Sequence, residues 1–207
     1  MRAGDHEGRM TKHQPEAKRR DQILEAARKL FVERGYVATK MSDIAELAGL
    51  SKGGVYFHFV SKEEVFSALV EDEFERSMGI IRMMSEQKEL DASFFPQLGT
   101  HFVERFYGES DTARFFIVMG EMALRDKDLR TKLQEIQMRY VDALSQLVER
   151  GQAAGLLRKV DPRATAILWK AMMDGLEANV ALDSTSELRK LDFQALVDVV
   201  LGGVLSK

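Results

Sequence analysis

Helix start and stop signals follow one another closely within one short stretch near the N-terminus of the chain. Thr39 or Ser42 is placed to cap a first short helix, and Gly49 ends that helix after barely two turns. Ser51 caps a second helix, which runs to about His58. The stretch is therefore predicted to hold two short helices joined by a tight turn.

Longer amphipathic helices are predicted on both sides of this stretch. The helix before it ends at Gly35, a natural C-terminal stop. Its apolar face consists of Ile23, Ala26, Ala27, Leu30 and Phe31. The helix after it opens at Ser61, which has the spacing of a capping box with Glu64. Its long apolar stripe consists of Phe66, Val70, Phe74, Met78 and Ile81. This helix is expected to connect a small N-terminal unit to the rest of the chain.

The rest of the chain is also predicted to be helical. Only three prolines occur, helix-favouring residues are abundant, and no stretch alternates apolar and polar residues for long enough to form a strand. Further helices are expected at about 91–107, 112–125, 128–153, from Asp161-Pro162 onward, and between Phe193 and Val204. The sequence therefore predicts an all-α fold of about nine helices.

Composition excludes several classes of site. The chain contains no cysteine, which rules out disulfides, thiolate metal ligands and cysteine nucleophiles. Its start has no apolar core of signal-peptide length, and nowhere do about 18 uncharged apolar residues run together. We expect a cytoplasmic protein with no membrane partner.

Charge divides the chain into two unequal parts. Ten Lys or Arg residues stand against six Asp or Glu between Lys12 and Lys62, a balance of +4. From Glu63 onward eighteen stand against twenty-five, a balance of −7. A small basic front and an acidic remainder indicate two separate tasks.

The two short helices have the properties of a helix-turn-helix. Ala45 and Ala48 let the helices approach closely, Gly49 takes the left-handed turn conformation, and Leu50 fills the core between them. The second helix presents Lys52, which can donate to guanine O6 or N7, and two glycines that let backbone approach the duplex. This helix is therefore predicted to dock in the major groove of double-stranded operator DNA.

Other side chains near this helix are suited to phosphate contacts. Tyr56 and His58 can reach the DNA backbone. Lys62 and the first amides of the following helix offer another phosphate site. Most of these contacts position the protein, and few of them can read bases.

The front of the chain resembles the N-terminal domain of the TetR/AcrR transcriptional regulators. The resemblance spans roughly Arg20 to Phe66, about a quarter of the chain. It is carried by Ile23-Leu24, Ala26-Ala27, Leu30-Phe31, Gly35-Tyr36, Thr39, Asp43-Ile44-Ala45, Ala48-Gly49-Leu50-Ser51-Lys52-Gly53, Val55-Tyr56, His58-Phe59 and Ser61-Lys62-Glu63. It implies a sequence-specific regulator. The DNA contacts it implies are Thr39, Lys52, Tyr56, His58 and Lys62, with the Gly53 backbone near a base.

Two positions depart from the commonest pattern of that family. Gly54 stands where a small or polar side chain is more frequent, so one base contact is absent. Phe57 has no hydroxyl for a phosphate, although it can contact a thymine methyl. The expected DNA-binding site comprises Thr39, Ser51, Lys52, Gly53, Gly54, Tyr56, Phe57, His58 and Lys62.

The resemblance also implies how the chain is divided. We expect a disordered leader at 1–17, a helix-turn-helix DNA-binding domain at 18–64, and a helical effector-binding and dimerisation domain at 65–207. The last two helices are expected to pair with their copies in a homodimer. The apolar face of the last helix supports this, and one short recognition helix reads too few base pairs to find an operator without a twofold partner.

The middle helices are rich in methionine and aromatic residues, which suit an adaptable apolar cavity. The expected pocket comprises Phe102, Phe106, Phe115, Phe116, Met119, Met122, Trp169, Met172 and Met173. Those residue types also form ordinary cores. A fairly large hydrophobic effector is expected there. Its polar end would be fixed by Arg105, Arg114, Glu121, Asp174 or Asn179. Effector binding is expected to release a repressor from a palindromic operator, and no metal or cofactor is implied.

Three other functions compete with this interpretation. An enzyme is disfavoured because the histidines (His6, His13, His58 and His101) have no metal spacing and no catalytic motif is visible. A helical carrier with a vestigial helix-turn-helix is disfavoured by the basic front. A regulator without an effector stays open, and a tightly packed middle without a cavity would favour it.

Overall fold

The computed structural model describes residues 16–87, 89–108, 110–182 and 193–202. Its helices are α1 (Glu16–Arg34), α2 (Met41–Leu47), α3 (Lys52–His58), α4 (Lys62–Ser85), α5 (Phe94–Gly108), α6 (Ser110–Arg125), α7 (Lys127–Ala153), α8 (Pro162–Ala181) and α10 (Phe193–Gly202). The predicted all-α fold is confirmed, with nine helices in these described ranges. Residues 1–15 of the expected leader and Val204 lie outside the described residues, whereas positions 16 and 17 belong to α1.

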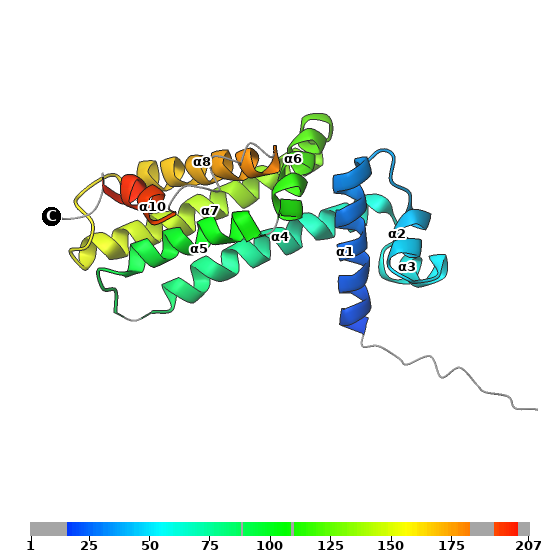
Figure 1. The fold of residues 1–207 in the computed structure, drawn as a ribbon, viewed down its shortest axis with the longest axis horizontal. Coiled ribbons are helices and arrows are strands. Elements are labelled where there is room, and N and C mark those ends of the chain that lie inside the picture. Colours follow the sequence, from blue (N-terminus) through cyan, green and yellow to red (C-terminus); the bar gives the residue numbers. More distant parts are fainter. Residues whose placement is uncertain (1–15, 88, 109, 183–192, 203–207) are drawn as a thin grey trace, which may run out of the picture.

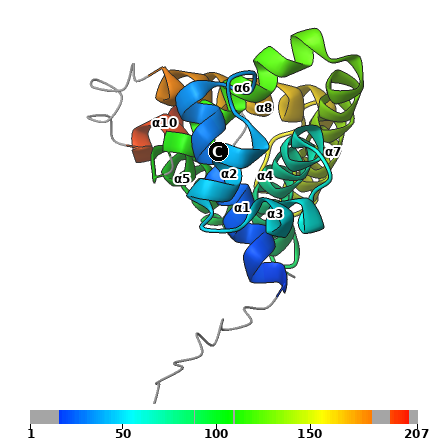
Figure 2. The ribbon, with the colours of Figure 1, turned by 90° about the vertical axis from the view of Figure 1, so that its right-hand side faces the viewer.

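The first three helices form a small unit, which lies at one end of the molecule (Figures 1 and 2). α1 ends where Gly35 adopts a φ of +80°, and Gly49, with a φ of +67°, makes the turn after α2. Ser51 begins α3, because its hydroxyl oxygen accepts a hydrogen bond from the Gly54 N–H at 3.1 Å. The helix-turn-helix predicted from these residues is therefore present.

The start of α2 differs from the sequence prediction. Its N-cap residue is Lys40, not Thr39 or Ser42. The Lys40 N–H donates to the Asp43 carboxylate at 3.0 Å, so an acidic side chain within the first turn satisfies the backbone there. Thr39 is buried, and its hydroxyl is engaged elsewhere.

Helix α4 runs from this unit into the larger group of helices (Figure 1). Ser61 caps it by accepting from the Glu64 N–H at 3.2 Å, and the Glu64 carboxylate accepts from the Val60 N–H at 2.7 Å. The predicted capping box is therefore present with one difference: the Glu64 carboxylate accepts from the Val60 N–H and not from the N–H of the N-cap residue Ser61. Phe66 and Phe74 of α4 are both buried, so one helix contributes to both parts of the core.

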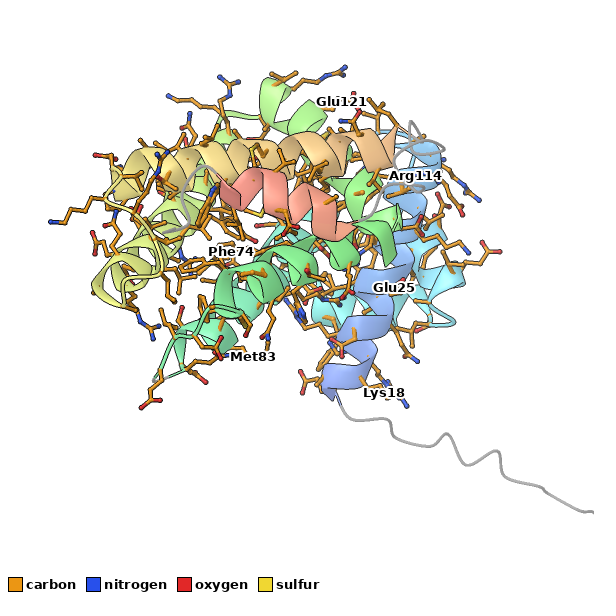
Figure 3. The ribbon with its side chains drawn as sticks, turned by 60° about the vertical axis from the view of Figure 1, so that its left-hand side comes forward. Lys18, Glu25, Phe74, Met83, Arg114 and Glu121 are labelled. Carbon is orange, nitrogen blue, oxygen red and sulfur yellow. The ribbon has the colours of Figure 1, made fainter. Side chains whose placement is uncertain are left out.

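Helices α5 and α7 pack beside the far half of α4, and α8 and α10 pack in turn on α7 and α5 (Figures 1 and 3). α8 begins at Asp161-Pro162 as predicted, and the Asp161 carboxylate accepts from the Ala164 N–H at 2.6 Å. α7 comes so close to α5 that a Cβ added at Gly151 would lie 2.5 Å from the Phe95 ring. Within the described residues no helix has the length and apolar character that crossing a membrane requires.

The two parts of the molecule contact each other chiefly through α1, α4 and α6. The ring centroids of Phe66 on α4 and Phe115 on α6 lie 5.4 Å apart, and Phe31 on α1 lies 5.5 Å from Phe66. This aromatic contact joins the core of the small unit to the larger helical part. A movement of α6 relative to α4 would therefore reach α1 directly.

Candidate nucleic-acid interface and effector cavities

Helix α3 exposes nearly its whole surface. Only Val55 among its residues is buried, and it anchors the helix to the core of the small unit. Tyr56 and Phe57 are 50% and 78% exposed, which is unusual for two adjacent aromatic side chains. Lys52 and Gly53 at the N-terminal end are also exposed. The predicted recognition surface is therefore free to contact another molecule.

Gly54 has a packing reason of its own. A Cβ at this position would lie 3.3 Å from the Ser51 hydroxyl oxygen and 3.8 Å from the Leu50 Cβ, and the Gly54 N–H bonds to that hydroxyl. The residue therefore sits against the cap of α3. His58 at the other end is half-buried, and its ring meets that of Phe57 edge to face at a centroid distance of 5.3 Å.

The side chain of Thr39 does not reach the surface. It is fully buried, and its hydroxyl donates to the Gly35 carbonyl at 2.9 Å and to the Leu30 carbonyl at 3.3 Å. Thr39 was expected to contact DNA, and the structure corrects this. The hydroxyl instead ties the start of α2 to the end of α1.

Lys62 is half-buried, and its ammonium is bonded within the protein. Its ammonium donates to the Tyr36 carbonyl at 2.7 Å and the Thr39 carbonyl at 2.8 Å, and it lies 4.3 Å from the centroid of the Tyr36 ring. The Lys62 ammonium, which was expected to contact a DNA phosphate, thus donates to carbonyls of the protein itself. In this structure Lys62 fixes the segment between α1 and α2 against the start of α4.

A neighbouring carboxylate completes this arrangement. The Tyr36 hydroxyl donates to Glu63 at 3.0 Å. The pKa of Glu63 is lowered because its carboxylate accepts from its own backbone N–H, from Ser61 and from Tyr36. The pKa of Tyr36 is raised, first by burial and then by the bond to Glu63. Both shifts favour the bonded pair at neutral pH.

A shallow depression of about 340 Å³ lies between the segment before α2 and the helix α3. It is lined by Val37, Thr39, Lys40, Met41, Ser42, Lys52, Tyr56 and Lys62. Lys40 and Val37 were not singled out from the sequence. Lys40 is exposed and adds a second cation to the surface on which Lys52 lies. No motif in the sequence marks Lys40, which lies just before a short helix, as part of this surface.

Two cavities lie among the helices of the larger part. The first, called the apolar cavity, has a volume of about 310 Å³ and is lined by Phe95, Leu98, Gly99, Phe102, Leu144, Trp169, Met172, Met173, Gly175, Leu176, Asn179, Val197, Val200 and Leu201. The second, called the acidic cavity, has a volume of about 520 Å³. It is lined by Val70, Glu73, Phe74, Ser77, Phe102, Thr112, Phe116, Ile117, Met119, Gly120, Glu121, Leu124, Leu133, Ile136, Gln137, Tyr140, Lys170, Met173, Asp174 and Glu177. Phe102 and Met173 line both.

The expected pocket residues divide between these cavities and the core. Trp169 and Met172 line the apolar cavity, Phe116 and Met119 line the acidic cavity, and Phe102 and Met173 line both. Two expectations are corrected. Phe115 is fully buried against Phe66, and Met122 packs on the core without lining either cavity. The side chain of Phe106 lies outside the described residues.

The polar residues expected at the effector's end also divide. Glu121 and Asp174 line the acidic cavity, and Asn179 lines the apolar one. Arg114 is exposed and lines neither, and the Arg105 side chain is outside the described part of the chain. Glu73, which lines the acidic cavity, could not be singled out from the sequence, because a carboxylate beside the apolar stripe of α4 has no sequence signal of its own.

Comparison with known proteins now separates the remaining functions. The model for bacterial regulatory proteins of the tetR family matches residues 23–69, and the model for the BetI-type transcriptional repressor C-terminal domain matches 101–205. The chain is 31% identical over 166 residues to the HTH-type transcriptional regulator YfiR of Bacillus subtilis, covering 78% of this chain and 80% of that protein.

The chain belongs to the TetR family of bacterial transcriptional regulators. Solved structures share its fold. Salmonella enterica GusR aligns with a TM-score of 0.72 at 22% identity, covering 92% of this chain and 97% of its own. SmeT of Stenotrophomonas maltophilia, solved in complex with triclosan, aligns with a TM-score of 0.69 at 24% identity, covering 92% and 93%.

Membership of the TetR family decides against the enzyme and against the carrier with a vestigial helix-turn-helix. The chain is a DNA-binding transcriptional regulator and not an enzyme. Its described residues contain no group of three or more His, Cys, Asp or Glu side chains placed to hold a metal ion. The helix-turn-helix of this TetR-family regulator consists of α2, the turn at Gly49 and α3.

Proposed function

We propose that this TetR-family regulator is a homodimeric repressor that leaves a palindromic operator when a small molecule binds its larger domain. The observation that carries the proposal is the exposure of α3, with Lys52, Tyr56 and Phe57 outward. Lys52 donates to a guanine edge, Phe57 contacts a thymine methyl, and Tyr56 contacts phosphate. The Ser51 and Gly53 backbone lies against the duplex at the start of the helix.

The two tasks fall to two domains. The DNA-binding domain comprises residues 18–64, and the effector-binding and dimerisation domain comprises residues 65–207. α4 crosses the boundary, and the buried residues Val65 and Phe66 lie directly after it. The basic balance of the first domain and the acidic balance of the second are consistent with this division.

A second copy of the chain covers the outer face of α8 and α10. Ile167 and Leu168 on α8 are 51% and 60% exposed, and Val199 on α10 is 80% exposed. Large apolar side chains exposed on the last two helices favour an interface between copies of the chain. The twofold axis of such a dimer places two α3 helices on successive major grooves of one duplex face.

The effector binds in the two cavities of the larger domain, the acidic cavity lined chiefly by α4, α6, α7 and α8 and the apolar cavity lined by α5, α7, α8 and α10. Their volumes, about 310 and 520 Å³, suit a drug-sized molecule. A cavity of this size disfavours a regulator that has no effector. SmeT, a relative in fold, has been solved with triclosan bound, which shows that this architecture can hold a small molecule. An effector that prefers the conformation with misplaced α3 helices lowers DNA affinity by linkage.

Selection of duplexes from a random pool by the full-length protein tests this function. The expected result is an enriched palindrome with two half-sites about 10 base pairs apart. Sedimentation of the protein with the selected duplex should show two chains on one site. Leu168→Glu should give monomers with weakened DNA binding, whereas Met138→Glu, an exposed position on α7, should leave the dimer intact. Enrichment of no sequence would contradict the proposal.

A further inference from the structure

The apolar cavity separates α8 from α10. Helix α10 packs chiefly on α5, and a Cβ added at Gly99 of α5 would lie 3.0 Å from both Cγ atoms of Val197 on α10. Helix α8 packs chiefly on α6 and α7. Figure 3 shows α10, in red, between α8 and α5. The two helices therefore face each other across the cavity that both of them line.

The open side of this cavity lies on the outer face of α8. Gly175 and Asn179 line the cavity and are exposed, whereas Phe95 and Leu144 on its inner side are buried. With 3.6 residues per turn, Gly175 and Asn179 both lie within about 20° of Leu168 around the helix axis. Leu168 is 60% exposed and belongs to the face on which the second copy of the chain is proposed to pack. A partner subunit on that face covers the mouth of the cavity.

The lining suits an uncharged molecule. None of the described residues that line the apolar cavity carries a charge, and only Trp169 and Asn179 among them have a side-chain N–H group. The Asn179 amide nitrogen already donates to the Gly175 carbonyl at 2.7 Å. Burial of an ionised group in such surroundings is strongly unfavourable, whereas burial of apolar surface is favourable. A single uncharged polar group has its place at the mouth, beside Asn179.

The volume of the cavity sets the size of its occupant. A protein cavity of about 150 Å³ lined by apolar side chains holds one benzene molecule. The apolar cavity, at about 310 Å³, has about twice that volume. The rings of Phe95 and Trp169, whose centroids lie 6.0 Å apart, form part of its wall. A molecule with two six-membered rings therefore matches the space.

We propose that the apolar cavity binds an uncharged molecule of about this size at the junction of the two subunits, and that the partner subunit closes over it. This rests on the proposed function, whose effector and dimer interface it specifies. The ligand fills the space between α8 and α10 and adds apolar surface to the face that meets the partner. Ligand binding therefore strengthens the dimer, and dimerisation strengthens ligand binding by the same factor. The orientation of the two subunits, which sets the spacing of the α3 helices, then depends on the occupant.

Three molecules with one body and different charge provide the first test. Biphenyl-4-methanol, biphenyl-4-carboxylate and biphenyl-4-methylammonium are titrated separately into the full-length protein in a calorimeter. The alcohol should bind one per chain. Both ions should bind at least about tenfold more weakly, because the partner subunit keeps water from the charged group. Binding of either ion as tight as that of the alcohol, or no binding of the alcohol, would overturn the proposal.

A substitution in the lining locates the site. Leu176 is half-buried and lines the apolar cavity, so Leu176→Trp should fill part of the space and weaken binding of the alcohol about tenfold or more. Leu176→Phe adds less volume and gives a smaller loss, which keeps the test usable if the tryptophan variant does not fold. Ile80→Trp is the matched control, because Ile80 is a half-buried aliphatic residue of α4 that lines neither cavity. Unchanged affinity in both Leu176 variants, or an equal loss in Ile80→Trp, would overturn the proposal.

The dimer gives a readout that a ligand site within one chain would not affect. Sedimentation at several protein concentrations should show that saturating alcohol lowers the dissociation constant of the dimer about tenfold. The monomeric variants Leu168→Glu and Val199→Glu should bind the alcohol more weakly by a similar factor, whereas Met138→Glu, which stays dimeric, should bind it like the wild type. A dissociation constant that does not fall, or monomers that bind the alcohol as tightly as the dimer, would overturn the proposal.

The same measurements separate this inference from the proposed function. A protein that binds the selected duplex as a dimer, and whose dimer does not respond to the alcohol, rejects the inference alone. A protein that enriches no duplex from the random pool rejects the function itself, whatever the alcohol does to the dimer.

Discussion

The ammonium of Lys62 lies 4.3 Å from the centroid of the Tyr36 ring and donates to the carbonyl of that same residue at 2.7 Å. A third partner, the Thr39 carbonyl, accepts from it at 2.8 Å. Lys62 opens α4, whereas Tyr36 and Thr39 belong to the segment that leads into α2. One side chain therefore sets the position of the helix-turn-helix relative to the helix that crosses into the effector domain.

Lys62→Met should destabilise the protein by about 1–3 kcal/mol, because the carbonyls lose a charged donor. DNA affinity should fall through the displaced helix-turn-helix, with no change in the slope of log affinity against log salt. Thermal unfolding and fluorescence anisotropy at several salt concentrations measure both effects. A phosphate contact would show the opposite pattern, with a smaller slope and unchanged stability.

Thr39→Val removes a hydroxyl that is fully buried and bonded to two carbonyls of the α1 end. We expect a loss of about 1 kcal/mol in the free energy of unfolding, measured by urea denaturation. Thr39→Ser keeps the hydroxyl and is the control, expected to lose less. Unchanged stability in the valine variant, together with weaker DNA binding, would return Thr39 to the set of DNA contacts.

Lys52→Ala should cost about 1–3 kcal/mol of DNA binding and relax the preference at one position in each half-site. The cause is the loss of a donor to a base edge from the exposed end of α3. Binding to a panel of single-substituted duplexes measures it. Lys159→Ala, an exposed lysine between α7 and α8, is the control. A loss that is equal on every duplex would assign Lys52 to phosphate instead.

The Glu63 carboxylate gives the small domain a dependence on acid. Its pKa in the folded protein is below the ordinary value of 4.5, so the stability it contributes is present above that value and is lost as the pH falls through the lower one. Lowering the pH from about 5 to about 3 should therefore reduce the free energy of unfolding of the wild-type protein more than that of Glu63→Gln. Parallel curves for the two proteins would show that the bonds to Ser61 and Tyr36 carry no such linkage.

Local signals explain why so much of the fold could be predicted from the sequence. Gly35, Gly49, Ser51 and Asp161 act through backbone conformation or through a bond three residues away, and each was found where it was expected. The predicted N-cap of α2, Thr39 or Ser42, was wrong, because the N-cap is Lys40 and Asp43, within the first turn, accepts from the Lys40 N–H.

Side chains whose partners lie far along the chain could not be placed in this way. Lys62 was expected to contact a DNA phosphate, and its partners in the structure are more than twenty residues earlier in the sequence. Phe115 and Phe116 are adjacent and chemically identical, but helical geometry turns the first into the core and the second towards the acidic cavity. Glu73 could be identified only from the structure, which shows both its ion pair with Arg28 and its place in the lining of the acidic cavity.

The central claim is that the exposed face of α3 reads a specific duplex. The most direct measurement is a titration of the selected palindrome, labelled with a fluorophore, by the full-length protein at increasing salt. Saturable binding that weakens steeply with salt, and that an unlabelled scrambled duplex fails to compete away, is the predicted result. Equal competition by the scrambled duplex, or no binding even at low salt, would contradict it.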